Sequence, residues 1–600
     1  MNSFMVLTIT LGLTACSSST TTQNNHSDRS SVSSTKQNKA LTNADQQLAK
    51  IISDEQSYQD SLNPFQKNSD QLYYDVSPQA LEAQFQQHLI FKQGLDNIDV
   101  TNLSPENRIN HTILLYKLNN QIDNYRFKEH YMPLTAEAGF HAYLPYMVDR
   151  SSFKTVEDYD TYLARLNYVP EYFQQQIAWM QLGLDTGRTQ PKVVLKGFED
   201  SISAFIVEDA ETSSFYRPFT QFPEHFDQPT QQRLSEQGKK AILDVINPTY
   251  QGFYRFMVED YIPNARSNIA ATSLPDGQNF YQNRIEYYTT LDLSAEEVHQ
   301  IGLEEVARIR AQMEQIIDRV GFQGSFAEFV EFLRTDPRFY AKSATELLKE
   351  ASYIAKKMDA QLPKLFKTLP RTPYGVVPVP ASIAPKYTTG RYSGPSRDDQ
   401  AGEYWVNTYA LDRRPLYVLE ALTLHEAVPG HHLQGSIARE MENVPKFRQR
   451  TYISAFGEGW GLYSEYLGIE AGFYQDPYSD FGRLTYEMWR AARLVVDTGM
   501  HSMGWSRDKA MNFLASNTAL SLHNVRTEID RYISWPAQAL SYKLGEIKIK
   551  ALRAKTEQAL GKEFDLREFH DEILKNGSLP LSLLETLIDE YIESEKSQLN

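Results

Sequence analysis

The sequence predicts a mainly α-helical fold with one small β element, and two patterns carry this prediction. From about residue 43 onward, apolar residues recur at three- and four-residue spacing, which is typical of amphipathic helices. Strand-like runs are confined to roughly residues 374–410, where VVPVP and EYWVNTYAL lie among Pro, Gly and Tyr. With 41% hydrophobic and 23% charged residues, the 600-residue chain is able to build a sizeable globular core.

The first residues predict a lipoprotein leader. Residues 2–15 form an apolar run of signal-peptide length, and the sequence there ends Leu13-Thr14-Ala15-Cys16. This ending resembles the lipobox of bacterial lipoproteins, in which the cysteine becomes the lipidated N-terminus. We therefore expect a signal peptide at 1–15 and a lipid on Cys16, with a plain signal peptide or a cysteine present by chance as the alternatives. By resemblance to Gram-negative lipoproteins, Ser17 in place of Asp favours the outer membrane.

The next segment, residues 16–42, is rich in Ser, Thr, Asn and Gln, so we expect a flexible tether. After it the sequence contains no run of 18 consecutive apolar residues, so membrane contact is expected through the N-terminal lipid only. The net charge of −16 disfavours nucleic acid and anionic membrane surfaces as partners, because such binding needs a basic surface.

The clearest helix is predicted over residues 293–321, where Ser294 and Glu297 form a capping box and Gly321 ends the helix. Further helices are expected at 343–366, 425–441, 448–470, 483–503, 507–518, 536–560 and 580–597. A division near residue 285 separates a helical N-terminal half, 43–285, from a half, 286–600, that holds nearly all the chemistry-bearing residues. The two halves are expected to form one catalytic unit.

A histidine cluster is the strongest functional signal. A single cysteine leaves imidazole and carboxylate to hold any metal, and residues 422–435 read LTLHEAVPGHHLQG. His425-Glu426 invites comparison with HExxH, but Pro429 occupies the position of the second histidine. On a regular helix, His431 lies about 240° around from His425, and His432 lies about 10.5 Å along the axis. Two of these histidines can share an ion only if Pro429-Gly430 interrupts the helix.

The alternative is that Pro-Gly ends the helix and leaves the histidines as polar loop residues. A third ligand favours the metal site: Glu458 lies in FGEGWGLYSEY, 27 residues after His431, at the head of an apolar helical pattern. Glu465, seven residues further on the same helical face, is a candidate to orient a ligand histidine. A solvated surface carboxylate is the alternative for Glu465.

These motifs together resemble the domain-of-unknown-function 885 family of bacterial proteins, many of them lipoproteins. The resemblance extends over roughly 45–600 and includes HEAVPGHHLQ, GEGWGLYSEYLG, LRTDPRFY, EYWVNTYAL, RLVVDTGMHSMGWSR and RYISWPAQALSYKLGE. The family looks like a branch of the zinc metallopeptidases, so the resemblance implies a large helical metallopeptidase-like fold. It also implies zinc ligands at His425, His431 (rather than His432) and Glu458, with Glu426 as the general base.

A polar stripe follows the predicted helix at 483–503. Arg493, Asp497 and His501 recur every four residues on an otherwise apolar helix. His501 is expected to donate a hydrogen bond to substrate or transition state, and Arg493 to bind substrate. A buried Arg493–Asp497 ion pair is the structural alternative.

Other candidates come from the tyrosine-rich C-terminal region and from the strand segment. Tyr542, one turn after Gln538, is expected to donate to the oxyanion, as is Tyr532, although packing is the commoner role for a tyrosine. Arg531 is a candidate to receive a substrate carboxylate, with an ion pair to Asp530 or Glu528 as the alternative. The segment EYWVNTYAL is expected to pair with an extended peptide, with Asn407 pointing into the groove.

The predicted function is therefore a membrane-anchored, zinc-dependent peptidase of the bacterial cell envelope. Glu426 would take a proton from metal-activated water and return it to the leaving amine of a peptide substrate. One alternative is a catalytically silent lipoprotein that binds a ligand, although retention of Glu426 disfavours it. The other is a zinc amidase that acts on a non-peptide or cell-wall amide.

Overall fold

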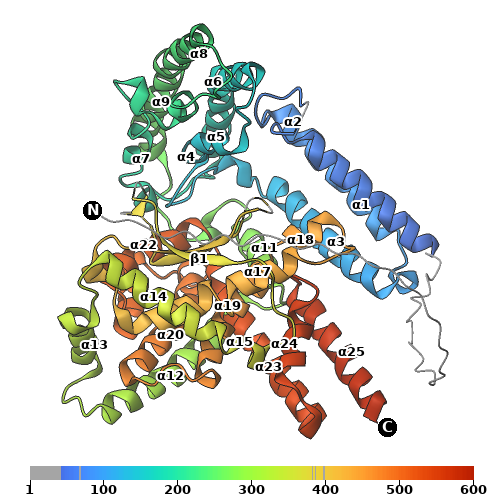
Figure 1. The fold of residues 1–600 in the computed structure, drawn as a ribbon, viewed down its shortest axis with the longest axis vertical. Helices are drawn as coiled ribbons and strands as arrows, with labels where there is room; N and C mark the ends of the chain where they lie inside the picture. The colour runs from blue at the N-terminus through green and yellow to red at the C-terminus, as the bar shows by residue number, and fades with distance from the viewer. Residues whose placement is uncertain are drawn as a thin grey trace, which may run out of the picture. The chain divides into compact units, whose positions relative to one another are not determined.

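Helices dominate the computed structural model, which describes residues 42–66, 69–381, 383–384, 387–395, 397 and 399–599 (Figure 1). The predicted mainly α-helical fold with a small β element is confirmed. The predicted signal peptide, Cys16 and nearly all of the tether lie outside the described residues. Thr42, the last residue of the predicted tether, caps the first helix.

The α-helices before the sheet are α1 Asn43–Ser61, α2 Pro78–Asp96, α3 Pro105–Arg126, α4 Phe140–Tyr143, α5 Met147–Arg150, α6 Val156–Thr186, α7 Glu199–Ser203, α8 Gln228–Ala241, α9 Asn247–Arg255, α10 Ile262–Asn264, α11 Gly277–Thr289, α12 Ala295–Arg319, α13 Phe326–Thr335, α14 Ala344–Asp359 and α15 Leu362–Leu365. Those after it are α16 Leu419–Glu426, α17 His431–Arg439, α18 Lys446–Arg450, α19 Ser454–Glu470, α20 Pro477–His501, α21 Arg507–Asn517, α22 Leu522–Ser534, α23 Ser541–Leu560, α24 Leu566–Leu574 and α25 Leu581–Leu599. The capping box of Ser294 and Glu297 at the start of α12 is present as predicted.

The sheet consists of β1 Tyr374–Pro378, β2 Gly390–Ser393 and β3 Gly402–Val406 in the order β1-β3-β2, within the predicted strand region. The central strand, β3, pairs in parallel with β1 and antiparallel with β2. Among the described residues only β3 pairs with β2, so β2 has one free edge. Helix α16 contacts β2, and helix α14 contacts β1.

Residues 42–600 form one compact unit, and its larger hydrophobic core draws side chains from both sides of residue 285, including Phe173, Tyr250 and Trp460. Two long helix pairs organise the C-terminal part: α12 packs along α20, and α19 packs along α23. Within the described residues, every helix falls short of the length or apolarity that a bilayer span requires.

The pairing of α19 with α23 depends on two glycines that touch. A Cβ on Gly545 would lie 2.0 Å from the carbonyl oxygen of Ala455 and 2.7 Å from the Cα of Gly459. Any side chain at this crossing would push the two backbones apart, because both obstructing groups belong to the main chain. The close approach places α19, which carries Glu458, against α23, which carries Tyr542.

We predict that Gly545→Ala destabilises the fold by about 1–3 kcal/mol, because overpacking a tight helix contact forces backbone shifts. The control is Gly252→Ala in α9, where a Cβ would meet no atom within 4 Å. There the lower entropy of the unfolded chain should stabilise the fold by about 0.4–1 kcal/mol. Unfolding monitored by circular dichroism measures both variants, and equal stability of the two would contradict the role of the crossing.

Candidate metal centre

The predicted helix 425–441 is interrupted, and this interruption brings its histidines together. Helix α16 ends at Glu426 and α17 begins at His431. Between them, Gly430 passes so close to the preceding turn that a Cβ would lie 1.8 Å from the carbonyl oxygen of His425. Only glycine fits at this point. The sharp turn brings His425 and His431 closer together than they would be in a continuous helix. The predicted interruption at Pro429-Gly430 is therefore confirmed.

Three predicted ligands converge at this turn. The distance from Glu458 Oε2 is 3.6 Å to His425 Nε2 and 3.5 Å to His431 Nε2, and one ligand atom from each residue lies within 4.8 Å of the others. Ligands of a tetrahedral zinc ion, with bonds of ~2.0–2.1 Å, lie about 3.3 Å apart. The donor set and its spacing therefore fit a zinc ion after small side-chain adjustments.

Helix α19 supplies Glu458 and also supports His425. A Cβ on Gly461 would lie 2.7 Å from two atoms of the His425 ring, so this glycine leaves the space that the ring occupies. His425 is 2% exposed, whereas His431 and Glu458 are half-buried and line a cavity. One ligand is thus anchored in the core while the others face open space.

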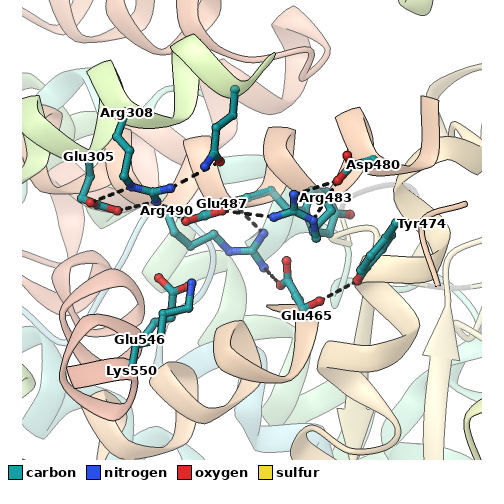
Figure 2. A network of polar contacts seen from close by, with 12 residues as sticks. Glu305, Arg308, Glu465, Tyr474, Asp480, Arg483, Glu487, Arg490, Glu546 and Lys550 are labelled. Carbon is teal, nitrogen blue, oxygen red and sulfur yellow. Dashed lines mark hydrogen bonds and ion pairs between the residues drawn. The ribbon is translucent and has the colours of Figure 1, made fainter. Parts of the chain in front are cut away.

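A buried carboxylate orients His425. Glu465 Oε1 lies 2.7 Å from His425 Nδ1 and 3.3 Å from Arg490 Nη2. Figure 2 shows Arg490 reaching the Glu465 carboxylate, while Tyr474 donates a hydrogen bond to the backbone carbonyl of Glu465. When His425 Nδ1 donates to Glu465, Nε2 presents its lone pair toward Glu458. This carboxylate–histidine arrangement is typical of metal ligands.

The electrostatic environment of His425 favours positive charge. Burial alone would lower the pKa of His425, but hydrogen bonds with Glu458 and Glu465 outweigh burial and raise that pKa to about 10. Burial alone would raise the pKa of Glu458, but hydrogen bonds with His425 and His431 hold that pKa well below its usual range. A divalent cation would supply the positive charge in place of the imidazole proton.

The three ligands open into a cavity of about 870 Å³ that is also lined by Glu426, Tyr542 and Arg531. Glu426 Oε2 accepts a hydrogen bond of 2.8 Å from the backbone amide of Tyr392 on β2. The predicted general base therefore lies between the metal ligands and the free edge of the sheet. Of the predicted substrate contacts, Tyr542, Arg531 and Arg493 all line this cavity.

His432 lies outside the ligand cluster. Its Nδ1 is 3.0 Å from Tyr392 Oη and 3.4 Å from Ser436 Oγ, and burial lowers the pKa of His432 to about 4. The turn directs consecutive side chains at 431 and 432 to different sides of α17. Geometry therefore places His431 with His425 and Glu458, as the family resemblance implies.

The prediction for His501 is wrong. Its Nδ1 accepts from the backbone amide of Ala271 at 3.0 Å, and its Nε2 lies 2.9 Å from the backbone oxygen of Tyr532. The side chain is fully buried and is absent from the cavity lining. Both nitrogens are thus engaged in joining α20 to neighbouring segments, and neither is available to substrate.

The alternative Arg493–Asp497 ion pair is also absent. Arg493 instead contacts Glu528 at 3.1 Å and Tyr532 Oη at 2.7 Å. Asp497 accepts hydrogen bonds from Tyr281 Oη and from the backbone amide of Ala537. Both side chains find partners on other elements because α20 is buried on all sides. Tyr532 is engaged with Glu528 and Arg493, which contradicts a role as oxyanion donor.

The prediction for Asn407 and its strand is wrong as well. Asn407 is fully buried and donates to the backbone carbonyls of Ala384, Tyr387 and Thr388, so it secures a loop and does not point into the cavity. Its strand β3 is paired on both sides and has no edge for a peptide. The free edge beside the cavity belongs to β2.

Sequence analysis missed three contributors to the site. Tyr452 donates a 2.8 Å hydrogen bond to Glu458 Oε1. The predicted helix over 448–470 would place these two residues on different faces, but the structure breaks it between α18 and α19, and Tyr452 lies at the break. The amide of Tyr392 contacts Glu426 through the backbone, which no side-chain pattern reports. Arg490 carried a usable signal, because it lies three residues before Arg493 and extends the same polar stripe of α20.

The fold and the site define a mainly helical protein with a histidine–glutamate centre of metal-binding type in a large cavity. The chain belongs to the family described as "Bacterial protein of unknown function (DUF885)", which it matches over residues 58–588. The predicted family membership is confirmed. None of the curated proteins compared with the chain matches it.

The solved structures similar to this chain include two described as putative lipoproteins. A "putative lipoprotein" from Colwellia psychrerythraea is 29% identical, with a TM-score of 0.83 over 92% of this chain and 100% of that chain. A "putative lipoprotein of unknown function" from Shewanella oneidensis is 16% identical, with a TM-score of 0.69 over 91% of this chain and 100% of that chain. The second likeness concerns the fold alone.

We predict that the full chain binds about one zinc ion and that His431→Ala abolishes this binding, because it removes one of three protein ligands. His432→Ala is the matched control, since the neighbouring imidazole lies outside the cluster. Inductively coupled plasma mass spectrometry of the dialysed proteins measures the metal content. Loss of zinc from the His432 variant with retention in the His431 variant would reverse the assignment.

We predict that His501→Gln changes the pH dependence of stability and leaves zinc content unchanged. Burial lowers the pKa of His501 to about 4 in the folded protein, below the unfolded value of 6.5. The stability tied to the neutral ring is present above pH 6.5 and is lost as pH falls toward 4. Without this ring, the slope of unfolding free energy against pH should decrease by about 1.4 kcal/mol per unit in that window. Urea unfolding at pH 5 and pH 7 measures the slope, and an unchanged slope would contradict the assignment.

Proposed function

We propose that this protein is a zinc-dependent hydrolase of peptide bonds. One observation carries the proposal: His425, His431 and Glu458 meet at one point, with Glu426 beside them, at the wall of a cavity of about 870 Å³. Two imidazoles and a carboxylate are a ligand set that catalytic zinc uses, with one position left for water or substrate. A purely structural zinc site would have four protein ligands and no adjoining cavity.

A zinc ion held by His425, His431 and Glu458 would supply a Lewis acid that polarises a carbonyl and lowers the pKa of water. The protein's own residues set the orientation of this centre. Glu465 holds the ring of His425 in place, and Tyr452 holds one oxygen of Glu458 through a 2.8 Å hydrogen bond. These two contacts leave His425 Nε2 and Glu458 Oε2 directed toward each other.

Glu426 is the proposed general base. It follows a metal ligand directly in sequence, lines the cavity, and is held by the amide of Tyr392 at one oxygen. Its carboxylate would take a proton from the attacking water and deliver it to the leaving amine. Tyr542, whose side chain lines the same cavity from α23, is the proposed donor to the developing oxyanion.

The free edge of β2 supports a peptide as the substrate. The backbone oxygen of Thr389 accepts a hydrogen bond from the amide of Asn407, so the backbone of Thr389 faces β3. The amide of Tyr392 points the other way, toward Glu426. Residues of a strand alternate in direction, so Gly390 presents its backbone groups on the same side as Tyr392. Residues 388–392 line the cavity. An extended peptide would therefore add to β2 as a further strand, next to the metal ligands.

We also propose that the protein acts in the cell envelope as a lipid-anchored protein. The support is the lipobox-like sequence ending at Cys16 and the similarity to a protein described as a "putative lipoprotein". The residue after Cys16 favours the outer membrane, and the anchor would leave the catalytic unit in the aqueous compartment beside the membrane.

The proposal predicts that Glu426→Gln retains zinc but lowers peptide hydrolysis by about 10²–10⁴-fold, because the variant loses the proton acceptor and keeps every ligand. Glu403→Gln, an exposed carboxylate on β3 outside the cavity lining, is the matched control and should retain activity. A peptide-library digest followed by mass spectrometry, together with zinc analysis, measures both properties. Equal activity of the Glu426 variant and the wild type would refute the mechanism.

A further inference from the structure

A group of buried arginines shares the cavity with the metal ligands. Arg490 and Arg493 of α20 are 5% and 2% exposed, and the Arg531 side chain of α22 is 12% exposed. All of them line the cavity. Burying a guanidinium is costly unless anions compensate its charge. The anionic partners of these arginines therefore indicate whether the group can bind a further anion.

The protein's own carboxylates compensate these arginines incompletely. Arg490 shares Glu465 with His425, at distances of 3.3 and 2.7 Å. Arg493 and Arg531 share a single oxygen, Glu528 Oε2, at 3.1 and 3.4 Å. Three guanidiniums therefore rely mainly on two carboxylates, and one of these also serves an imidazole.

Further anionic support for the group is weak. Arg531 Nε lies 3.8 Å from Glu137, whose side chain is half exposed, and this distance exceeds that of a hydrogen bond. Arg493 Nη1 is buried and has no hydrogen-bond partner among the described residues, and the same holds for Arg490 Nε. Arg531 Nη2 donates to the neutral Gln538 Oε1 at 2.7 Å. The group thus retains surplus positive charge, and its unused donors belong to Arg490 and Arg493.

The arginines contact Tyr542, which lines the same cavity as the metal ligands. The guanidinium carbon of Arg493 lies 4.2 Å from the centre of the Tyr542 ring, and that of Arg490 lies 5.9 Å from it. Arg490 in turn contacts Glu465, which contacts the metal ligand His425. The arginines therefore adjoin the metal centre through a short series of direct contacts and do not form a separate site.

We propose that Arg531, positioned by Glu528 and backed by Arg493, binds a carboxylate of the substrate, so that the enzyme prefers peptides with a free C-terminus. A guanidinium pairs with a carboxylate through two parallel hydrogen bonds, and Arg531 is the most exposed of the group. The substrate carboxylate would supply a further anion to the arginine group. This inference rests on the proposed peptidase function and names its substrate class.

Binding to zinc-loaded Glu426→Gln tests the subsite without turnover. Isothermal titration calorimetry compares Ala-Ala-Ala as the free acid, Ala-Ala-Ala amide and Ala-Ala-Glu amide. We expect the free acid to bind about 10- to 100-fold more tightly than the plain amide, as a charge-assisted pair requires. Tight binding of Ala-Ala-Glu amide alone would support the carboxylate site but overturn the preference for a free C-terminus, because the carboxylate would then come from a side chain. Equal affinity for all three peptides would overturn the proposal.

In the Glu426→Gln protein, a second substitution Arg531→Gln should reduce the ratio of free-acid to amide affinity to near one. Arg531→Lys should give an intermediate ratio, because lysine keeps the charge but loses the paired donors of the guanidinium. The matched control is Arg507→Gln, an arginine paired with Asp530 outside the cavity lining, which should keep the ratio. A purely structural role for Arg531 would lower stability and leave the ratio unchanged. If the glutamine variant does not fold, the lysine variant decides: an unchanged ratio there overturns the proposal.

Hydrolysis by the wild-type protein separates this inference from the proposed function. Preferential cleavage of free-acid peptides would support both. Acid preference in binding without any hydrolysis would refute the peptidase proposal and leave the carboxylate subsite standing. Hydrolysis of acid and amide peptides with equal kcat/KM would refute the subsite alone.

Discussion

The turn between α16 and α17 is the constraint on which the metal centre depends. In a continuous helix, His425 and His431 would face different directions about 9 Å apart along the axis. The missing side chain of Gly430 lets the backbone pass against the carbonyl of His425, and the histidine rings come within 4.7 Å of each other, centre to centre. Glu458 then meets both from α19, whose own position depends on the glycine contact with α23.

Buried charge surrounds this centre on several helices. Helix α20 carries Glu487, Arg490 and Arg493, whose charged partners lie on α12, α19, α22 and α23. Figure 2 shows Glu487 with Arg308 of α12 and Arg490 with Glu465 of α19. Lys543, for example, contacts both Glu487 and Glu546 and is 1% exposed. Such pairs contribute little net stability after desolvation, but removing one partner is costly. They therefore restrict how α20 can pack, and α20 contributes Tyr486, Trp489, Arg490 and Arg493 to the cavity wall.

Sequence patterns predicted much of the fold and the ligands. Helix α12, with its capping box, follows from local spacing, because a helix repeats every 3.6 residues and its caps are nearby in sequence. His425, Glu426 and Glu458 were identifiable because their residue types suit zinc chemistry. The roles of Asn407 and His501 were mispredicted for one reason: polar residues on apolar elements serve equally well to satisfy buried backbone groups.

The sequence by itself determined the helical class, the small strand region and the residue types available to a metal. It also determined that two of the histidines can share an ion only if the helix breaks at Pro429-Gly430. Only the tertiary structure decided that His431 joins the cluster, that β2 offers the free edge, and that the arginines gather beside it. The physical reason is the distance along the chain over which a sequence pattern acts. Local periodicity reports the backbone conformation, whereas contacts such as Tyr392 with Glu426 or Arg490 with Glu465 join separate elements, whose packing no spacing rule encodes.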